Sequence, residues 1–321
     1  MTSVFQNEWY VLFRSLGVIC LMFVGTMLGQ DDDPIRVDTE LVTFEVTVTG
    51  KDGKPVAGLK AGDFRIFDNG VERQVDFFQP ITDAEQNRPM LVIFALDVSG
   101  SMTAAEMESL RNALKQSIKR LGAPNTYFAI MTFAMRVRTL AGFSNIPQRL
   151  DRSLEKLARD TGGLSTHAYD AVDDAIRLIV KKAPKSIRGQ VPKRSVVVIT
   201  DGFPVGDVVA PETVIERANA AEVSVYSIIM PSYSRLQGTK RPLMTPFEAS
   251  GLVERTGGIN LYAGDKSLES LFAELESQVT GSYAVAFYPE PGRSVDDFRE
   301  VRIETQEGLK LRQNRPGYRP R

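Results

Sequence analysis

The chain has 321 residues and a formal net charge of −1, with 39 Lys and Arg residues against 40 Asp and Glu residues. This balance excludes the broad basic face that nucleic-acid-binding domains use to contact phosphates. A hydrophobic share of 43% and a charged share of 25% are ordinary for a globular protein of one large domain or two smaller ones.

The first 30 residues differ from the rest of the chain. Arg14 precedes an apolar run, Leu16–Leu28, which is short for a membrane-spanning helix and typical of the core of a secretory signal. We therefore predict that residues 1–30 are a signal peptide or an N-terminal anchor that inserts through residues 11–28, and that the body of the protein is exported to the periplasm or the cell exterior. A poorly packed cytoplasmic start is the remaining alternative. Cys20, the only cysteine, lies in the apolar run, so the rest of the chain has no disulfide and no thiolate metal site.

Residues 36–80 carry strand patterns. Leu41–Val48 alternate apolar and polar residues, and Asn69-Gly70 separates two further alternating runs, which predicts a β-hairpin. Strand-like runs return in residues 282–318. Each piece alone has too few strands to close a core, so we predict that both flanks pair into one β-sandwich-like domain. Two separate β pieces are the alternative.

Residues 85–281 alternate strands with helices. Continuous apolar runs predict strands that are buried on both faces, and amphipathic helical patterns separate them. The predicted strands are 90–97, 126–134, 194–200, 223–230 and 259–262, with 136–140 as a short hairpin partner. The predicted helices are 103–122, 146–158, 168–183, 211–222, 247–258 and 267–279. This order predicts an α/β fold, a doubly wound and mostly parallel sheet with helices on both faces.

Two of these helices allow finer predictions. Thr103 with Glu106 predicts a capping box at the start of the helix 103–122. In the helix 168–183, the spacing predicts that Val180 faces the core and that Asp173 and Asp174 belong to a solvated face.

Oxygen-bearing side chains gather where the predicted strands end. Asp97, Ser99 and Ser101 follow the first buried strand, Thr166 precedes the helix 168–183, and Asp201 follows the strand 194–200. Ligands of open parallel sheets bind outside the carboxyl ends of the strands, so we expect these residues to meet there. Two carboxylates and three hydroxyls are hard oxygen ligands that suit Mg²⁺, with Mn²⁺ and Ca²⁺ as alternatives. Since Thr103 already caps the next helix, a plain capping role does not explain the two serines.

These motifs resemble a known family. Asp-x-Ser-x-Ser after an apolar strand, a Thr in a loop leading to Tyr-Asp-Ala, and Ile-Thr-Asp-Gly after another strand are similar to the von Willebrand factor type A (VWA) domain, over about residues 85–281. The pattern resembles the metal-ion-dependent adhesion site (MIDAS) of that family. The flanking β segments also resemble those of bacterial exported proteins of the type A-related class.

The resemblance implies roles for the five residues. Ser99, Ser101 and Thr166 would be direct metal ligands, and Asp97 and Asp201 would act directly or through water. A partner protein would complete the metal shell with its own Asp or Glu.

One loop departs from the family pattern. Residues 161–170 are a residue or two longer than the usual loop, which leaves Ser165 or Thr161 as alternatives to Thr166.

The sequence favours a binding module that is not an enzyme. A phosphotransferase with an aspartyl nucleophile would carry a second carboxylate two residues after Asp97, where this chain has Ser99. His167 is the only histidine, which argues against a Ser-His-Asp triad. It is either a surface side chain without a role or a pH-sensitive contact to a partner. A scaffold or accessory subunit of an envelope complex and a metal-dependent hydrolase remain the alternative functions, and the sequence does not fix the partner or the oligomeric state.

Overall fold

The structure is a computed structural model that describes residues 41–80, 88–99, 103–122, 125–157, 165–230, 244–264, 266–290 and 297–320. The described residues all belong to one compact unit, Thr39–Arg321. The predicted signal or anchor and Ser101 lie outside the described residues. Within the described ranges, no helix combines the length and the apolar character needed to span a membrane.

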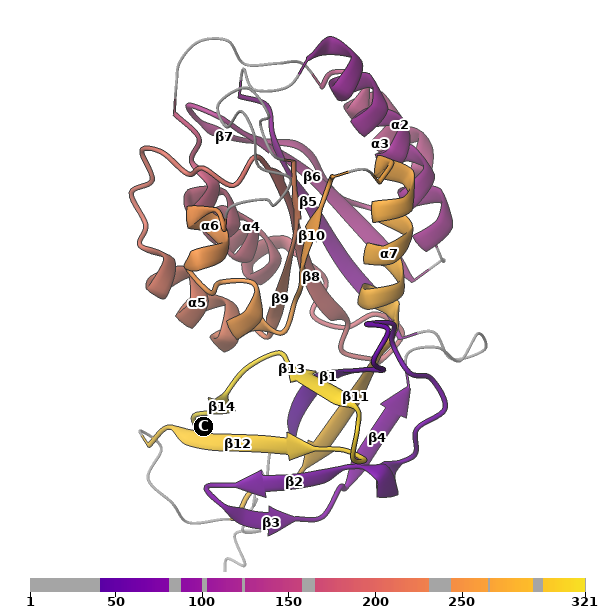
Figure 1. Cartoon of the computed structure of the whole chain (residues 1–321), viewed down its shortest axis with the longest axis vertical. Coiled ribbons are helices and arrows are strands. Elements are labelled where there is room, and N and C mark those ends of the chain that lie inside the picture. The colour runs from indigo at the N-terminus through magenta and orange to yellow at the C-terminus, as the bar shows by residue number, and fades with distance from the viewer. Residues whose placement is uncertain are drawn as a thin grey trace, which may run out of the picture. The chain divides into compact units, whose positions relative to one another are not determined.

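A six-stranded sheet with the order β10-β9-β8-β5-β6-β7 forms the middle of the α/β part (Figure 1). Neighbouring strands run parallel except β6 and β7, which are antiparallel. The strands are β5 Met90–Asp97, β6 Thr126–Phe133, β7 Val137–Ser144, β8 Lys193–Thr200, β9 Val223–Ile229 and β10 Asn260–Tyr262. The predicted doubly wound, mostly parallel sheet is confirmed.

Helices cover both faces of this sheet, with α2, α3 and α7 on one side and α4, α5 and α6 on the other (Figure 1). They are α2 Ala104–Leu121, α3 Pro147–Leu154, α4 Ala168–Lys182, α5 Pro211–Ala220, α6 Pro246–Ala249 and α7 Leu268–Thr280. The predicted helix 247–258 is wrong as a single element, because α6 is followed by a separate 3₁₀ turn, η2 Glu254–Thr256. Gly251 lies between them with φ at 69°, in the left-handed region that ends a helix.

Strand β5 explains why the sheet has two cores. All eight of its residues are buried. Val92, Phe94 and Leu96 belong to the core under α2 and α7, whereas Ile93 and Ala95 belong to the core under α4 and α5. Successive side chains of a strand point to opposite faces, so a strand covered on both sides needs an unbroken apolar run.

Two predictions about α4 are wrong. Val180 is 58% exposed and does not face the core. Asp173 is only 2% exposed, although its neighbour Asp174 is exposed as predicted. Asp173 accepts hydrogen bonds from Arg177 at 2.7 Å and from Arg217 at 2.6 Å. Arg217 comes from α5, so the ion pair that offsets the cost of burying the Asp173 carboxylate cannot be predicted from the sequence of α4.

The two flanks of the chain build a β-sandwich. Its sheets have the orders β13-β1-β11-β4 and β14-β12-β2-β3. The elements are β1 Val42–Thr49, η1 Ala61–Asp63, β2 Arg65–Asp68, β3 Val71–Arg73, β4 Phe77–Pro80, β11 Ser282–Phe287, β12 Arg299–Glu304, β13 Lys310–Gln313 and β14 Gly317–Tyr318. Strand β1 pairs with β11 and β13, and β2 pairs with β12, so each sheet takes strands from both flanks. Phe44, Ile66, Val285 and Ile303 lie in the core that the two sheets share, which confirms the predicted sandwich.

Candidate metal site at the carboxyl edge of the sheet

Asp97 is the last residue of β5, the strand between β6 and β8. Its side chain is held on both oxygens. Oδ1 accepts a hydrogen bond from the Ser99 amide, and Oδ2 accepts one from the Thr200 hydroxyl, each at 2.9 Å. Thr200 is in position to donate because the parallel register of β5 and β8 pairs the residues just before Asp97 and Thr200. The carboxylate is therefore oriented before any ligand binds.

Asp201 follows β8 directly and lies in a tight turn. Its Oδ1 accepts a hydrogen bond from the Phe203 amide at 3.0 Å, while the Gly202 amide donates to the Thr200 hydroxyl at 3.1 Å. Gly202 has φ at 84°, and a Cβ there would lie 2.5 Å from the Thr245 hydroxyl oxygen. Only glycine fits this turn, which carries Asp201 next to the end of β5.

Thr166 is held across this edge by backbone hydrogen bonds. Its amide and carbonyl exchange two bonds with Val205, each at 2.9 Å, and the His167 amide donates to the Ala134 carbonyl at 3.2 Å. Ala134 follows β6, and Val205 lies in the loop after β8. Because β6 and β8 flank β5, these bonds fix the Thr166 segment to the loops on both sides of the strand that carries Asp97. Thr166 is 6% exposed.

Four of the five predicted site residues can thus be placed. Asp97, Ser99, Thr166 and Asp201 lie on adjacent strand ends and on the segment bridged to them, and Ser99 is 7% exposed. Ser101 lies outside the described residues.

The helix after the Asp97 turn has its own cap. Thr103 Oγ1 accepts from the Glu106 amide at 3.2 Å, and the Glu106 carboxylate accepts from the Thr103 amide at 2.6 Å, which confirms the predicted capping box. The side chains of Asp97 and Ser99 are therefore not used to cap α2. The N-termini of α2 and α4 begin shortly after Ser99 and Thr166 and contribute positive potential nearby.

The environment of Asp97 is buried and polar without a cationic partner. Burial raises the pKa of the Asp97 carboxyl, and hydrogen bonds from Ser99, Thr200 and the Asp201 backbone offset part of that rise. No Lys or Arg of the described residues forms an ion pair with it. Burying a carboxylate with only neutral donors is costly, and a bound cation would compensate that cost.

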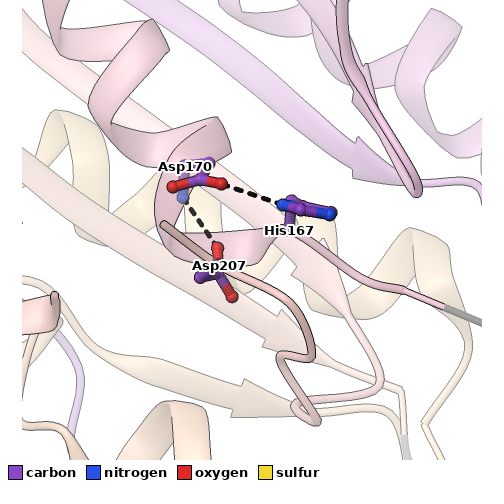
Figure 2. Close-up of side chains that lie close together, drawn as sticks. All are labelled: His167, Asp170 and Asp207. Atoms are coloured by element: carbon purple, nitrogen blue, oxygen red, sulfur yellow. Dashed lines mark hydrogen bonds and ion pairs between the residues drawn. The ribbon is translucent and has the colours of Figure 1, made fainter. Parts of the chain in front are cut away.

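A second polar cluster lies beside Thr166 (Figure 2). His167 Nδ1 lies 2.9 Å from Asp170 Oδ2, and the Asp170 amide donates to Asp207 Oδ1 at 2.8 Å (Figure 2). The Asp170 carboxylate also accepts from the amides of Val208 and Val209, at 2.9 to 3.1 Å. Asp170 on α4 therefore fixes the end of the loop that begins with Asp201. The side chain of His167 is 19% exposed and paired, so the prediction of a surface histidine without a role is wrong.

The pKa directions agree with this arrangement. Burial alone would raise the pKa of Asp170, but the hydrogen bonds from His167, Val209 and Val208 outweigh it and leave the pKa lowered. Burial raises the pKa of Asp207.

Asp170 and Asp207 were not among the predicted site residues. The i, i+3 spacing of His167 and Asp170 was the available signal for one contact, whereas nothing local points to Asp207. One imidazole nitrogen and two carboxylate oxygens lie within 4.8 Å of one another, a donor set that a metal ion such as zinc accepts. Since three backbone amides and one imidazole already contact these carboxylates, the role that the geometry supports is to hold the loops.

These features define a class of α/β domain with a polar site at the carboxyl edge of a mostly parallel sheet. The site consists of a buried Asp-x-Ser turn and of Thr and Asp side chains from neighbouring loops. The family model of the von Willebrand factor type A (VWA) domain matches residues 92–241, which lie within the α/β part of the chain. The predicted family is thereby confirmed for this part of the chain.

Individual relatives are distant. Integrin alpha-X of Mus musculus is 29% identical over 140 residues, which are 43% of this chain and 12% of the integrin. Among solved structures, an aerotolerance-related membrane protein of Bacteroides fragilis is 17% identical, with a TM-score of 0.46 over 59% of this chain and 98% of that one. Proximal thread matrix protein 1 from the mussel byssus, solved with a zinc-occupied MIDAS motif, is 16% identical, with a TM-score of 0.47 over 62% of this chain and 47% of that one.

Proposed function

We propose that the carboxyl edge of the six-stranded sheet binds a divalent cation and presents it to an acidic side chain of a partner protein. The proposed ion is Mg²⁺, with Mn²⁺ and Ca²⁺ as alternatives. The proposed protein ligands are Asp97, Ser99, Ser101, Thr166 and Asp201.

The observation that carries the proposal is the backbone frame around Asp97. Bonds from Thr166 to Val205 and from His167 to Ala134 hold a hydroxyl-bearing segment between the loops on either side of β5. Hydroxyl and carboxylate oxygens are the donors that Mg²⁺ prefers, in octahedral geometry and with some water retained. The residues present therefore fit a hard divalent cation.

Charge counting supports an open position for a partner. Two carboxylates, Asp97 and Asp201, face one divalent ion, and neutral hydroxyls supply the remaining protein ligands. An acidic side chain from another protein would complete the coordination and add a negative charge, which a neutral water ligand cannot supply.

The loops around the site carry exposed apolar side chains. Met135 after β6 is 42% exposed, and Phe203 and Val205 after β8 are 43% and 53% exposed. Arg136, next to Met135, is also exposed. This rim favours a partner segment in which the acidic residue has apolar neighbours, because both could be buried in one contact.

The test is isothermal titration calorimetry of the purified chain with MgCl₂, MnCl₂ and CaCl₂, comparing the wild type with Asp97→Ala. We expect saturable binding to the wild type and none to Asp97→Ala. Circular dichroism must show that the variant is folded. Thermal stabilisation by metal in Asp97→Ala equal to that of the wild type would contradict the proposal.

Three further variants identify the ligand in the 161–170 loop. Thr166→Ala should abolish metal binding, while Thr166→Ser and Ser165→Ala should retain it. The reverse result for Ser165→Ala would transfer the role to Ser165.

Partner binding is tested separately from metal binding. Envelope extract is passed over the immobilised chain with MgCl₂, and bound proteins are eluted with EDTA. We expect a partner that elutes with EDTA and does not bind Asp97→Ala. Retention after EDTA and by the variant would exclude a metal-bridged contact.

We further propose that the protein is an exported, non-enzymatic module, anchored or released through its first 30 residues. A scaffold or accessory subunit of an envelope complex would use the same site and differ only in its partner. A metal-dependent hydrolase is the third candidate, and hydrolysis of ester or phosphate substrates that disappears in Asp97→Ala would favour it.

A further inference from the structure

We propose that a basic segment at the opposite end of β8 from the metal site docks on an anionic lipid surface. Between Asp174 and Asp201 the chain has seven Lys and Arg residues and no Asp or Glu. This concentration is local, since the net charge of the whole chain is −1.

Three of these cations form the core of the basic segment, defined as Lys182, Lys185 and Arg188. All three are exposed, and none forms an ion pair with another described residue. The other four differ. Arg177 pairs with Asp173, Lys181 lies in electrostatic range of Asp174, Lys193 is buried and Arg194 donates to a backbone carbonyl.

Helix energetics explain only part of the segment. A lysine in the last turn of a helix interacts favourably with the helix dipole, which accounts for Lys182 at the end of α4. Lys185 and Arg188 lie beyond that end. They belong to a connection that the dipole does not stabilise.

Arg188 occupies a costly backbone position. Ile187 and Gln190 exchange two backbone hydrogen bonds, at 3.0 and 3.1 Å, around a two-residue turn made by Arg188 and Gly189. Both turn residues have positive φ, 51° and 79°. Such turns favour Asn or Gly at the first position, so arginine there is unfavourable for the backbone and places a cation at the tip of a rigid turn. A strained residue at an exposed tip points to a function outside the fold.

Apolar side chains flank the cations. Val180 and Val191 are 58% and 54% exposed, whereas Ile187 is 8% exposed and anchors the turn. Lys182 and Arg188 are six residues apart, so their Cα atoms lie within about 22 Å of each other. Cations and exposed aliphatic groups within that span match the headgroup region of an anionic bilayer. The cations would contact the lipid phosphates, and the valines and lysine methylenes would contact the upper part of the acyl chains.

The connectivity favours lipid over an acidic protein. Arg88 donates to the Val191 carbonyl at 3.0 Å and also forms an ion pair with Glu45 on β1. Glu45 lies four residues after the first described residue, and the apolar run Leu16–Leu28 precedes it along the chain. The thirteen residues from Leu28 to residue 41 span at most about 45 Å, so a bilayer that holds the run is within reach of the basic segment.

This orientation would leave the metal site free. Strand β8 begins at Lys193 and ends at Thr200, which places its two ends about 23 Å apart. The basic segment precedes the first end, and Asp201 follows the second. A body docked through the basic segment would direct the metal site away from the membrane.

The test measures partitioning of the full chain onto vesicles of phosphatidylcholine alone and of phosphatidylcholine with phosphatidylglycerol. Charges beside the apolar run, such as Arg14, also respond to lipid charge, so the contact is read from the change in the ratio of the two partition constants between the wild type and a variant of the basic segment. The test variant is Lys182→Gln/Lys185→Gln/Arg188→Asn, in which Asn suits the positive φ. We expect its ratio to fall by about 100-fold at low salt, and the wild-type ratio to fall toward the same value at high salt.

A matched control removes the same charge elsewhere. Lys115→Gln/Arg138→Gln/Lys156→Gln should keep the wild-type ratio. An equal fall in the control, or no fall in the test variant, would overturn the proposal. Asp97→Ala and EDTA should leave the ratio unchanged, which separates this result from failure of the metal-dependent function.

A probe locates the contact. Val191→Cys in a Cys20→Ser chain, labelled with an environment-sensitive dye, should shift to the blue with phosphatidylglycerol vesicles. An unchanged spectrum would place the lipid contact elsewhere. Binding of the basic segment to soluble polyglutamate but not to these vesicles would assign an acidic polypeptide instead.

Discussion

Thr200 is the strongest test of the claim that Asp97 is pre-oriented for a metal ion. Thr200 is 1% exposed, donates to Asp97 Oδ2 at 2.9 Å and accepts from the Gly202 amide at 3.1 Å. Thr200→Val keeps the shape of the side chain and removes both hydrogen bonds. A hydrogen bond to a charged group contributes about 1.5–3 kcal/mol and one between neutral groups about 1 kcal/mol, so we expect the free energy of unfolding to fall by about 2–4 kcal/mol.

Metal affinity should fall as well. Groups that orient a metal ligand typically contribute about 10- to 100-fold to affinity, so Thr200→Val should weaken Mg²⁺ binding by that factor. Thr200 contributes no ligand in our proposal, and the loss would come from a carboxylate that is free to rotate and easier to protonate.

The assays are urea denaturation without metal and calorimetric titration with MgCl₂. Thr200→Ser keeps the hydroxyl and should stay close to the wild type in both. If Thr200→Val unfolds within about 0.5 kcal/mol of the wild type and binds Mg²⁺ equally well, the reasoning about Asp97 is refuted.

Three further substitutions probe other contacts. Asp170→Ala removes the acceptor that holds the loop after Asp201 and should weaken Mg²⁺ binding about tenfold, as measured by calorimetry. A variant that binds Mg²⁺ as tightly as the wild type would contradict this role. Asp173→Ala leaves two half-exposed arginines without their buried acceptor and should cost about 1–2 kcal/mol in urea denaturation, while Asp174→Ala on the exposed side should cost little. Gly70→Ala should cost about 1 kcal/mol from backbone strain alone, since φ is 81° and no atom lies within 4 Å of an added Cβ; a neutral result would mean that the turn adopts another form.

The hairpin at Asn69-Gly70 and the strand β5 show what local sequence predicts well. Asn69 and Gly70 have positive φ, 48° and 81°, as a two-residue turn between β2 and β3 requires. The apolar run of β5 predicts burial on both faces because side-chain direction alternates along any strand. Both features depend on neighbours along the chain, so composition and spacing are sufficient to predict them.

Helix faces were less predictable, because they depend on what covers them. The pattern of α4 placed Val180 inside and Asp173 outside, and both assignments are wrong. Asp173 tolerates burial because Arg217 of α5 reaches it. Val180 is exposed although Ile179, its neighbour in the same turn, is buried, so the covered face of α4 is narrower than the apolar pattern predicts.

The candidate site also combines features that could be predicted from the sequence with features that could not. Three parts of the site could be predicted from the sequence: the oxygen donors, the apolar strands that precede Asp97 and Asp201, and the capping box at Thr103, which gives α2 a cap other than Ser99. The folded chain adds the contacts that could not be predicted: Thr166 is bridged to Val205, Thr200 orients Asp97, and Asp170 and Asp207 hold the surrounding loops. The physical reason is that these contacts join residues of separate strands and loops, whose spacing along the chain carries no information about their distance in space.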